Sequence, residues 1–233
     1  MTQPMYGNMW EGSKPSDMVD ETDDRDLLTD PHLDKFGRSL GPKELIDLEC
    51  LSGLLYQHGG TKIRLLAIEK ALENDVSRVW AEFGCERGHS TNFFSLYLPP
   101  GGELYTFDSF EGLPEDWALS YKNIRPKRAW ACSVPVFEDE RVHVVQGWFE
   151  DTLPMEYPGP LGFIHIDSDL YVSAKTILKK NNDQIIAGTI ILFDELWGYP
   201  NWLDGEFKAL MEWDREWEYL VRDTKGRTLI AVL

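Results

Sequence analysis

The chain has 233 residues and a formal net charge of −17, from 40 acidic and 23 basic residues. This length suits one α/β domain with a substantial core and a leader of some tens of residues, so two full domains are not expected. The negative charge repels phosphate backbones and anionic membrane surfaces, which argues against nucleic acid and membranes as partners.

The first 40 residues are predicted to be an acidic leader. Residues 1–34 hold nine acidic and two basic residues, a composition typical of a solvated, partly disordered segment. The opening residues have no basic stretch followed by an apolar core, so neither a secretory signal nor a transit peptide is expected. The three cysteines lack the CxxC spacing of a zinc site or a disulfide framework. Together these features predict a cytoplasmic protein.

The rest of the chain alternates between helical and strand-like segments. Residues 41–60 and 61–74 have apolar residues at helical spacing, which predicts N-terminal helices within 41–77. Short β-type runs follow, separated by segments that can hold helices, at 78–83, 103–108, 141–147, 161–167 and 189–195. This alternation predicts an α/β domain over 78–233 with a doubly wound, mainly parallel sheet. At the C-terminus, two strand-like runs flank a Lys225-Gly226 turn, which predicts an antiparallel hairpin at one edge.

Acidic residues and glycines gather where the predicted strands end. Four of the five strand ends carry an acid and two carry glycine, at Glu82, Gly84, Asp108, Gly147, Asp167, Asp194 and Glu195. Ligands of parallel α/β sheets bind outside the carboxyl ends of the strands. The sequence therefore predicts a functional site at this edge of the sheet.

The first strand is followed by the short glycine loop GCERG, residues 84–88. A helix is predicted to begin after it, with the hydroxyls of Ser90 and Thr91 able to cap it and its free amides suited to an anionic group. Asp108 lies about 20 residues beyond the loop, where dinucleotide-binding folds hold ribose hydroxyls. The GxGxxG pattern is absent, so we expect an adenosine ligand without a diphosphate.

Five segments, in this order and spacing, resemble a known family: EFGCERGHS, FDSFEGLPEDW, GWFEDTLP, HIDSDLY and FDELWGYPNW. They are similar to S-adenosylmethionine-dependent O-methyltransferases related to the macrocin and mycinamicin sugar methyltransferases. The resemblance covers roughly residues 78–233 and implies a Rossmann-like methyltransferase fold. It implies methyl transfer to a hydroxyl of a small molecule such as a sugar or natural-product glycoside. The strand-end pattern is also similar to that of the metal-dependent catechol O-methyltransferase.

The resemblance implies a place for each cofactor-binding residue. The methionine part of S-adenosylmethionine would contact Glu82 and Gly84, with Ser90 near its carboxylate. Asp108 would bind the ribose hydroxyls. The residues around the adenine would be Ser109, Trp148 and Phe149, although Trp148 and Phe149 are equally well explained as core residues.

The resemblance also implies a magnesium site formed by Asp167, Asp194 and Glu195, with Asp167 and Asp194 as catalytic residues. Magnesium prefers octahedral oxygen ligands, so these carboxylates can hold it and leave positions for substrate hydroxyls. The metal would lower the pKa of the reacting hydroxyl and align its oxygen with the methyl group. Asp169 is better explained as a cap of the helix that begins near Tyr171.

No general base is assigned by resemblance, because Leu170 occupies the position of the catalytic lysine of catechol O-methyltransferase. The candidates are Asp194, His89 and His165. His165 lies in an apolar strand and is better explained as a hydrogen-bonded structural histidine. His89 is better explained as a neighbour of the cofactor.

Two segments are candidates for contact with the methyl acceptor. Trp197, Tyr199 and Trp202 suit stacking on a sugar or aromatic ring, and a hydrophobic plug that anchors the next helix explains them nearly as well. The long connection 110–132 could form a substrate lid, whose basic cluster of Arg125, Lys127 and Arg128 would receive an anionic substrate. Solvation of surface charges explains this cluster about as well.

Two rival functions remain open at the level of sequence. The Asp167-Ser168-Asp169 segment resembles the DxD metal motif of nucleotide-sugar glycosyltransferases, but that interpretation leaves the glycine loop and Asp108 unexplained. A non-catalytic protein that keeps the methyltransferase fold is the other. The sequence identifies neither the methyl acceptor nor the oligomeric state, and a homo-oligomer stays open.

Overall fold

A computed structural model describes residues 61–222 and 226–233 of the chain. The predicted acidic leader and the predicted helix at 41–60 lie outside these residues. No helix in the described part of the chain is long and apolar enough to cross a membrane.

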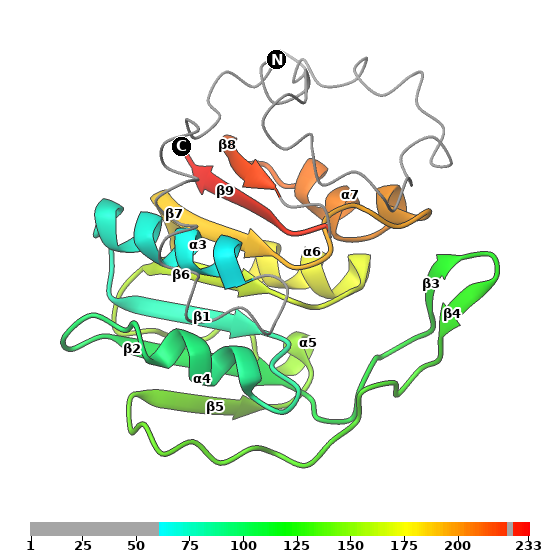
Figure 1. Cartoon of the computed structure of the whole chain (residues 1–233), viewed down its shortest axis with the longest axis horizontal. Coiled ribbons are helices and arrows are strands. Elements are labelled where there is room, and N and C mark those ends of the chain that lie inside the picture. The colour runs from blue at the N-terminus through cyan, green and yellow to red at the C-terminus, as the bar shows by residue number, and fades with distance from the viewer. Residues whose placement is uncertain (1–60, 223–225) are drawn as a thin grey trace.

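A seven-stranded sheet forms the centre of the fold, in the order β5-β2-β1-β6-β7-β9-β8 (Figure 1). The five predicted parallel strands are β1 (Val79–Phe83), β2 (Glu103–Asp108), β5 (Val142–Gln146), β6 (Leu161–Ile166) and β7 (Ile185–Phe193). The C-terminal pair β8 (Trp217–Arg222) and β9 (Thr228–Val232) is antiparallel, and β9 pairs antiparallel with β7. The predicted mainly parallel sheet and its C-terminal hairpin are therefore confirmed.

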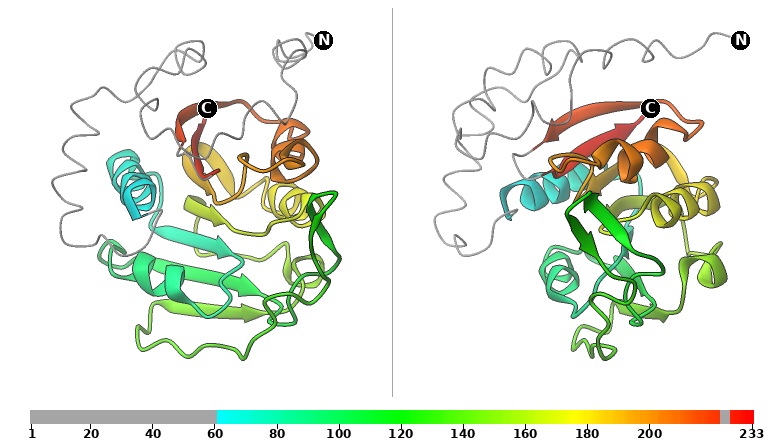
Figure 2. Two further views of the ribbon diagram at one scale, coloured as in Figure 1. Left: turned by 45° about the vertical axis from the view of Figure 1, so that its right-hand side comes forward. Right: turned by 90° about the vertical axis from the view of Figure 1, so that its right-hand side faces the viewer.

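Helices cover both faces of the sheet (Figures 1 and 2). One face packs against α3 (Thr61–Asn74) and α4 (His89–Ser95), in an apolar cluster that includes Leu66, Phe94 and Phe163. The other face packs against α6 (Tyr171–Lys180) and α7 (Glu206–Met211), in a cluster that includes Ile164, Ile177 and Leu210. Neighbouring residues such as Phe163 and Ile164 belong to opposite clusters because successive side chains of a strand point to opposite faces. Burial on both faces explains the nearly continuous apolar runs of β1 and β6.

The strand order reverses direction between β1 and β6. From β1 the chain moves to β2 and then β5 on one side, and later returns to β6 and β7 on the other. Such a switch point leaves room for a ligand at the carboxyl ends of the two central strands. The loops after β1 and β6 are in close contact there, because a Cβ at Gly84, whose φ is +90°, would lie 1.8 Å from the carbonyl oxygen of Asp167. Only glycine fits this position.

The long connection after β2 contains a small hairpin that the sequence does not predict. It consists of β3 (Trp117–Ser120) and β4 (Asn123–Arg125), which pair antiparallel and form a separate two-stranded sheet. The hairpin extends in front of the edge formed by the carboxyl ends of the strands (Figure 2). Two further short helices, α5 (Phe149–Thr152) and the 3-10 helix η2 (Trp202–Asp204), follow β5 and β7.

Candidate functional site

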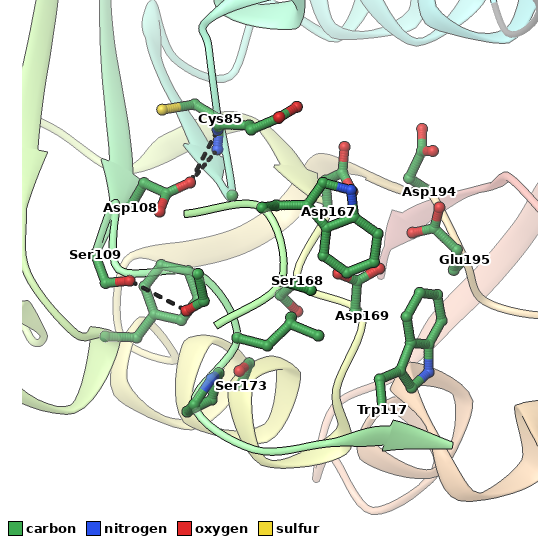
Figure 3. Close-up of a pocket in the computed structure, with 18 of the residues that line it drawn as sticks. Cys85, Asp108, Ser109, Trp117, Asp167, Ser168, Asp169, Ser173, Asp194 and Glu195 are labelled. Atoms are coloured by element: carbon green, nitrogen blue, oxygen red, sulfur yellow. Dashed lines mark hydrogen bonds between the residues drawn. The ribbon is translucent and has the colours of Figure 1, made fainter. Parts of the chain in front are cut away.

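A cavity of about 380 Å³ lies at the carboxyl ends of the parallel strands. Nearly all the predicted site residues line it, namely Gly84, Ser90, Asp108, Ser109, Trp148, Phe149, Asp167, Asp194 and Glu195. Figure 3 shows Asp167, Asp169, Asp194 and Glu195 gathered on one side of the cavity, with Asp108 and Cys85 on the other. The structure thus brings together the glycine loop and the strand-end acids, as the strand-end rule predicts.

Asp108 fixes the shape of the glycine loop. Its Oδ2 accepts hydrogen bonds from the backbone N–H groups of Cys85 (3.0 Å) and Glu86 (2.9 Å), and its Oδ1 accepts one from Phe110 (2.8 Å). A carboxylate has about four lone-pair sites, so these bonds leave roughly one acceptor position. Asp108 therefore holds the loop in place and can still accept one further hydroxyl from the cavity.

Glu82 lies below the floor of the cavity and is not part of its wall. Its side chain is fully buried, accepts hydrogen bonds from Thr91 and Thr106, and pairs with Nδ1 of His165 at 3.0 Å. The predicted cap by Ser90 and Thr91 is wrong, because the N-cap of α4 is Gly88 and has no side-chain hydrogen bond. The hydroxyl of Thr91 instead satisfies Glu82, a contact that joins α4 to β1.

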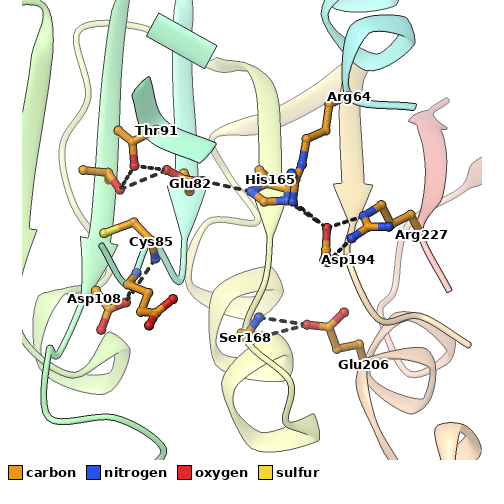
Figure 4. A network of polar contacts seen from close by, with 12 residues as sticks. Arg64, Glu82, Cys85, Thr91, Asp108, His165, Ser168, Asp194, Glu206 and Arg227 are labelled. Atoms are coloured by element: carbon orange, nitrogen blue, oxygen red, sulfur yellow. Dashed lines mark hydrogen bonds and ion pairs between the residues drawn. The ribbon is translucent and has the colours of Figure 1, made fainter. Parts of the chain in front are cut away.

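His165 is enclosed between two carboxylates (Figure 4). Its Nδ1 lies 3.0 Å from Oε1 of Glu82, and its Nε2 lies 3.7 Å from Oδ1 of Asp194. Burial alone would lower the pKa of this imidazole, but the carboxylates of Asp194 and Glu82 outweigh burial and raise it to about 9. The interpretation of His165 as a structural histidine agrees with this position, since a fully buried imidazolium cannot reach a substrate.

Asp194 is neutralised by cations from two distant segments. Its Oδ1 pairs with Arg64 of α3 at 3.0 Å and with Nε of Arg227 at 2.8 Å, and its Oδ2 accepts from Arg227 at 3.2 Å. Burial would raise the pKa of Asp194, but the charges of His165, Arg64 and Arg227 hold it well below its usual range. Sequence reasoning missed Arg64, because it treats α3 as a helix that precedes the core.

A second group of acids forms no ion pair with a lysine or arginine of the described residues. Carboxylate oxygens of Asp167, Asp169 and Glu195 all lie within 4.8 Å of one another. Burial, and then repulsion among neighbouring acids, raises the pKa of all three carboxyl groups, that of Asp167 to about 7. Oε2 of Glu195 is buried without a hydrogen-bond partner among the described residues. This donor set fits a divalent cation that prefers oxygen ligands.

The structure shows that Asp169 does not cap a helix. The N-cap of α6 is Leu170, with no side-chain hydrogen bond, and Asp169 adopts the left-handed conformation with φ of 62°. This conformation aims its carboxylate at Asp167 and Glu195 instead. A second group of three potential metal ligands shares Asp167 and consists of His165, Asp167 and Asp194. Asp194 therefore borders the predicted metal site, even though its charge is already paired.

Glu206 of α7 supports the turn between Asp167 and Asp169. Its Oε1 accepts hydrogen bonds from the backbone N–H (3.1 Å) and the hydroxyl (3.0 Å) of Ser168 (Figure 4). Its Oε2 is buried without a hydrogen-bond partner among the described residues, and burial raises the pKa of this carboxyl group to about 8. Sequence reasoning missed Glu206 because nothing in the local pattern around α7 indicates a contact 38 residues away.

The aromatic residues after β7 form a plug. Tyr199 and Trp202 are buried in the core cluster beside α7, and the ring of Trp202 lies 4.6 Å from that of Phe207. None of Trp197, Tyr199 and Trp202 lines the cavity. The aromatic residues at the cavity are instead Trp148, Phe149 and, from the connection after β2, Trp117 and Trp130. Phe149 also contacts Phe83 of the core, at 5.8 Å between ring centroids, so it belongs both to the cavity wall and to the core.

The fold and the cavity define a Rossmann-like methyltransferase, and sequence comparison identifies the family. Residues 61–205 match the macrocin O-methyltransferase (TylF) family, which is more than half of the chain, and the chain therefore belongs to this family. The resemblance predicted from the five sequence segments is confirmed.

One curated relative and several solved structures are similar to the chain. A protein of Streptomyces olivaceus, 8-demethyl-8-(2,3-dimethoxy-alpha-L-rhamnosyl)-tetracenomycin-C 4'-O-methyltransferase, is 31% identical over 147 residues, which are 55% of this chain and 56% of that protein. The chain thus spans just over half the length of this relative. The calicheamicin methyltransferase CalS11 has a TM-score of 0.59 at 20% identity, over 91% of this chain and 99% of that one. The O-methyltransferase NovP has a TM-score of 0.56 at 22% identity, over 82% and 80%.

Proposed function

We propose that the chain is an S-adenosylmethionine-dependent O-methyltransferase that uses a divalent cation and methylates a hydroxyl of a sugar or natural-product glycoside. The observation that carries this proposal is the shared cavity, which places the glycine loop and Asp108 opposite the carboxylates of Asp167, Asp169 and Glu195. Membership of the family favours methyl transfer over the glycosyltransferase and non-catalytic alternatives. The Streptomyces olivaceus relative is a 4'-O-methyltransferase of a rhamnosyl-tetracenomycin, which supports a glycoside as acceptor.

The side of the cavity that carries the glycine loop is the proposed cofactor site. Gly84 and Ser90 border the methionine part, the open acceptor position of Asp108 takes a ribose hydroxyl, and Ser109, Trp148 and Phe149 surround the adenine. When bound, S-adenosylmethionine supplies the methyl group and carries a positive sulfonium charge. The many carboxylates of the cavity favour a cation over an anion there.

The opposite side is the proposed metal site, with Asp167, Asp169 and Glu195 as ligands. When bound, the cation supplies Lewis acidity that lowers the pKa of a coordinated hydroxyl. The carboxylates fix that hydroxyl in position facing the cofactor side, a positioning effect that lowers the barrier to transfer. Asp194 lies beside this group. Because it pairs with Arg64 and Arg227, it stays ionised and keeps the floor of the site in one conformation. Of the three candidate bases, Asp194 and His89 face the cavity.

Binding and turnover measured on the full chain test the proposal. Calorimetry in EDTA is expected to show binding of S-adenosylmethionine, because the metal and cofactor sides use different residues. A panel of glycosides and phenols with adjacent hydroxyls, followed by mass spectrometry, is expected to show a methylated product with magnesium and none in EDTA. Full turnover in EDTA would reject the metal, and failure to bind the cofactor would reject the enzyme class.

A further inference from the structure

The segment from Trp117 to Trp130 differs in charge from the rest of the chain. It holds four basic residues and no acidic one, whereas the whole chain has a net charge of −17. Its hairpin β3–β4 extends in front of the carboxyl ends of the strands (Figure 2). The segment is basic and the cavity beside it is acidic. A ligand that contacts both therefore has one end in a positive potential and the other end in a negative potential.

Two indoles at the base of this segment belong to the cavity. Trp117 and Trp130 both line it, with ring centroids 6.1 Å apart. Trp117 is buried and makes an edge contact with Tyr199 at 5.5 Å, so its ring is held in place. Trp130 is 43% exposed. An exposed indole at a cavity mouth presents an apolar face on which a sugar ring can pack.

The basic side chains of this segment are held near the cavity rim by their backbone. The N–H of Arg128 donates to the carbonyl of Leu113, a cavity residue, at 2.9 Å, and the N–H of Lys127 donates to Oδ1 of Asp116 at 2.7 Å. The side chains of Arg125, Lys127 and Arg128 are exposed. Among residues 61–222 and 226–233, no carboxylate forms an ion pair with any of the three.

We propose that this segment is an acceptor-binding arm that selects a sugar carrying an anionic group, a phosphate or a carboxylate. The face of Trp130 packs on the sugar ring, while Arg125, Lys127 and Arg128 bind the anion by charge-assisted hydrogen bonds. The carboxylates on the cavity floor repel the same anion, so the acceptor binds with its anionic end at the rim and its hydroxyl end inward. This inference rests on the proposed function, since it names the class of acceptor for that site.

Four probes test the charge preference by calorimetry on the full chain with S-adenosylhomocysteine and magnesium. Glucose 1-phosphate and UDP-glucose carry phosphate, glucuronic acid carries a carboxylate, and methyl glucoside is neutral. At least one anionic probe is expected to bind about tenfold or more tightly than methyl glucoside, and the comparison among them separates phosphate from carboxylate. Equal affinity for the neutral and anionic probes would overturn the proposal.

A triple variant, Arg125→Gln with Lys127→Gln and Arg128→Gln, tests the residues. It is expected to lose about tenfold or more in affinity for the preferred anionic probe and to keep the affinity for methyl glucoside and S-adenosylhomocysteine. Lys179→Gln is the control, because Lys179 is an exposed basic residue in the last turn of α6 and does not line the cavity. An equal loss in the control, or no loss in the triple variant, would overturn the proposal. Repeating the titrations without S-adenosylhomocysteine keeps this result separate from a failure of cofactor binding.

Discussion

Asp108 shows how one carboxylate can both shape a loop and line a cavity. It accepts hydrogen bonds from three backbone N–H groups, two of them in the glycine loop. The sequence indicates Asp108 from its position at the end of β2, but it does not reveal that most of its acceptor capacity is used by the protein itself. Its removal therefore affects the loop as well as the ligand.

Asp108→Ala is expected to weaken binding of S-adenosylhomocysteine by at least tenfold, because hydrogen bonds to a charged group contribute about 1.5 to 3 kcal/mol each. Titration calorimetry measures the change. Asp139→Ala is the control, since Asp139 also accepts a backbone N–H, that of Arg141, just before β5, away from the cavity. Unchanged affinity in a folded Asp108 variant would remove this residue from the cofactor site.

Asp167→Asn and Asp169→Asn are expected to be equally damaging. Each removes one of three charges that face a common point, and asparagine tolerates the left-handed conformation that Asp169 adopts, so the backbone is preserved. Turnover is expected to fall by orders of magnitude in both variants, with binding of S-adenosylhomocysteine retained. Manganese binding, measured by electron paramagnetic resonance, checks the cause. Wild-type manganese affinity in Asp169→Asn would restore Asp194 as the third ligand.

At the scale of elements, α7 stabilises a turn that lies far from it in sequence. Glu206 accepts both hydrogen bonds that Ser168 offers, and so holds the two flanking aspartates in one conformation. A second element, α3, reaches the same floor through Arg64. Helices that cover opposite faces of the sheet therefore both stabilise the acidic side of the cavity.

Glu206→Gln is expected to change the pH dependence of stability. The raised pKa of about 8 means that the folded state holds a proton that the unfolded state releases above about 4.5, so stability falls as pH rises from about 4.5 to 8. The effect is on the order of a few kcal/mol, and glutamine, which does not titrate, removes it. Urea unfolding in EDTA at pH 6 and pH 8.5 measures the difference. The same pH slope in the variant and the wild type would show that Glu206 does not titrate in this range.

At the scale of the whole molecule, most of the fold follows from local patterns. Buried strands such as β1 and β6 give apolar runs, and the strand-end rule then places Asp167 and Glu195 in one site without any knowledge of contacts. Contacts between distant segments could not be predicted in this way. Arg227 on Asp194, Glu206 on Ser168 and the positive φ of Asp169 depend on how loops pack, and no sequence periodicity encodes them. The sequence allows two interpretations of Trp202, a ring that stacks on the substrate and a hydrophobic plug. Only the packing of the folded chain decides for the plug.

Magnesium is expected to raise the thermal stability of the whole molecule. A cation that binds only the folded state stabilises it by mass action, and at this site it would also relieve repulsion among half-buried carboxylates. At about 100 times the dissociation constant the gain is about 2.7 kcal/mol, visible as a rise in melting temperature. Asp169→Asn provides the control and is expected to show little rise. If magnesium raised the melting temperature of Asp169→Asn as much as that of the wild type, the cation would bind at another site.

The contact between Gly84 and the carbonyl of Asp167 has a consequence for how this protein can vary. Any side chain at position 84 would displace the residue that follows β6, because the carbonyl oxygen lies 1.8 Å from where a Cβ would be. The loop proposed to bind the cofactor and the loop proposed to bind the cation therefore touch at this contact. The hairpin that we propose selects the acceptor is not part of this contact, so it can be exchanged without disturbing it. A substitution at position 84, in contrast, is expected to change affinity for the cofactor and affinity for the cation together.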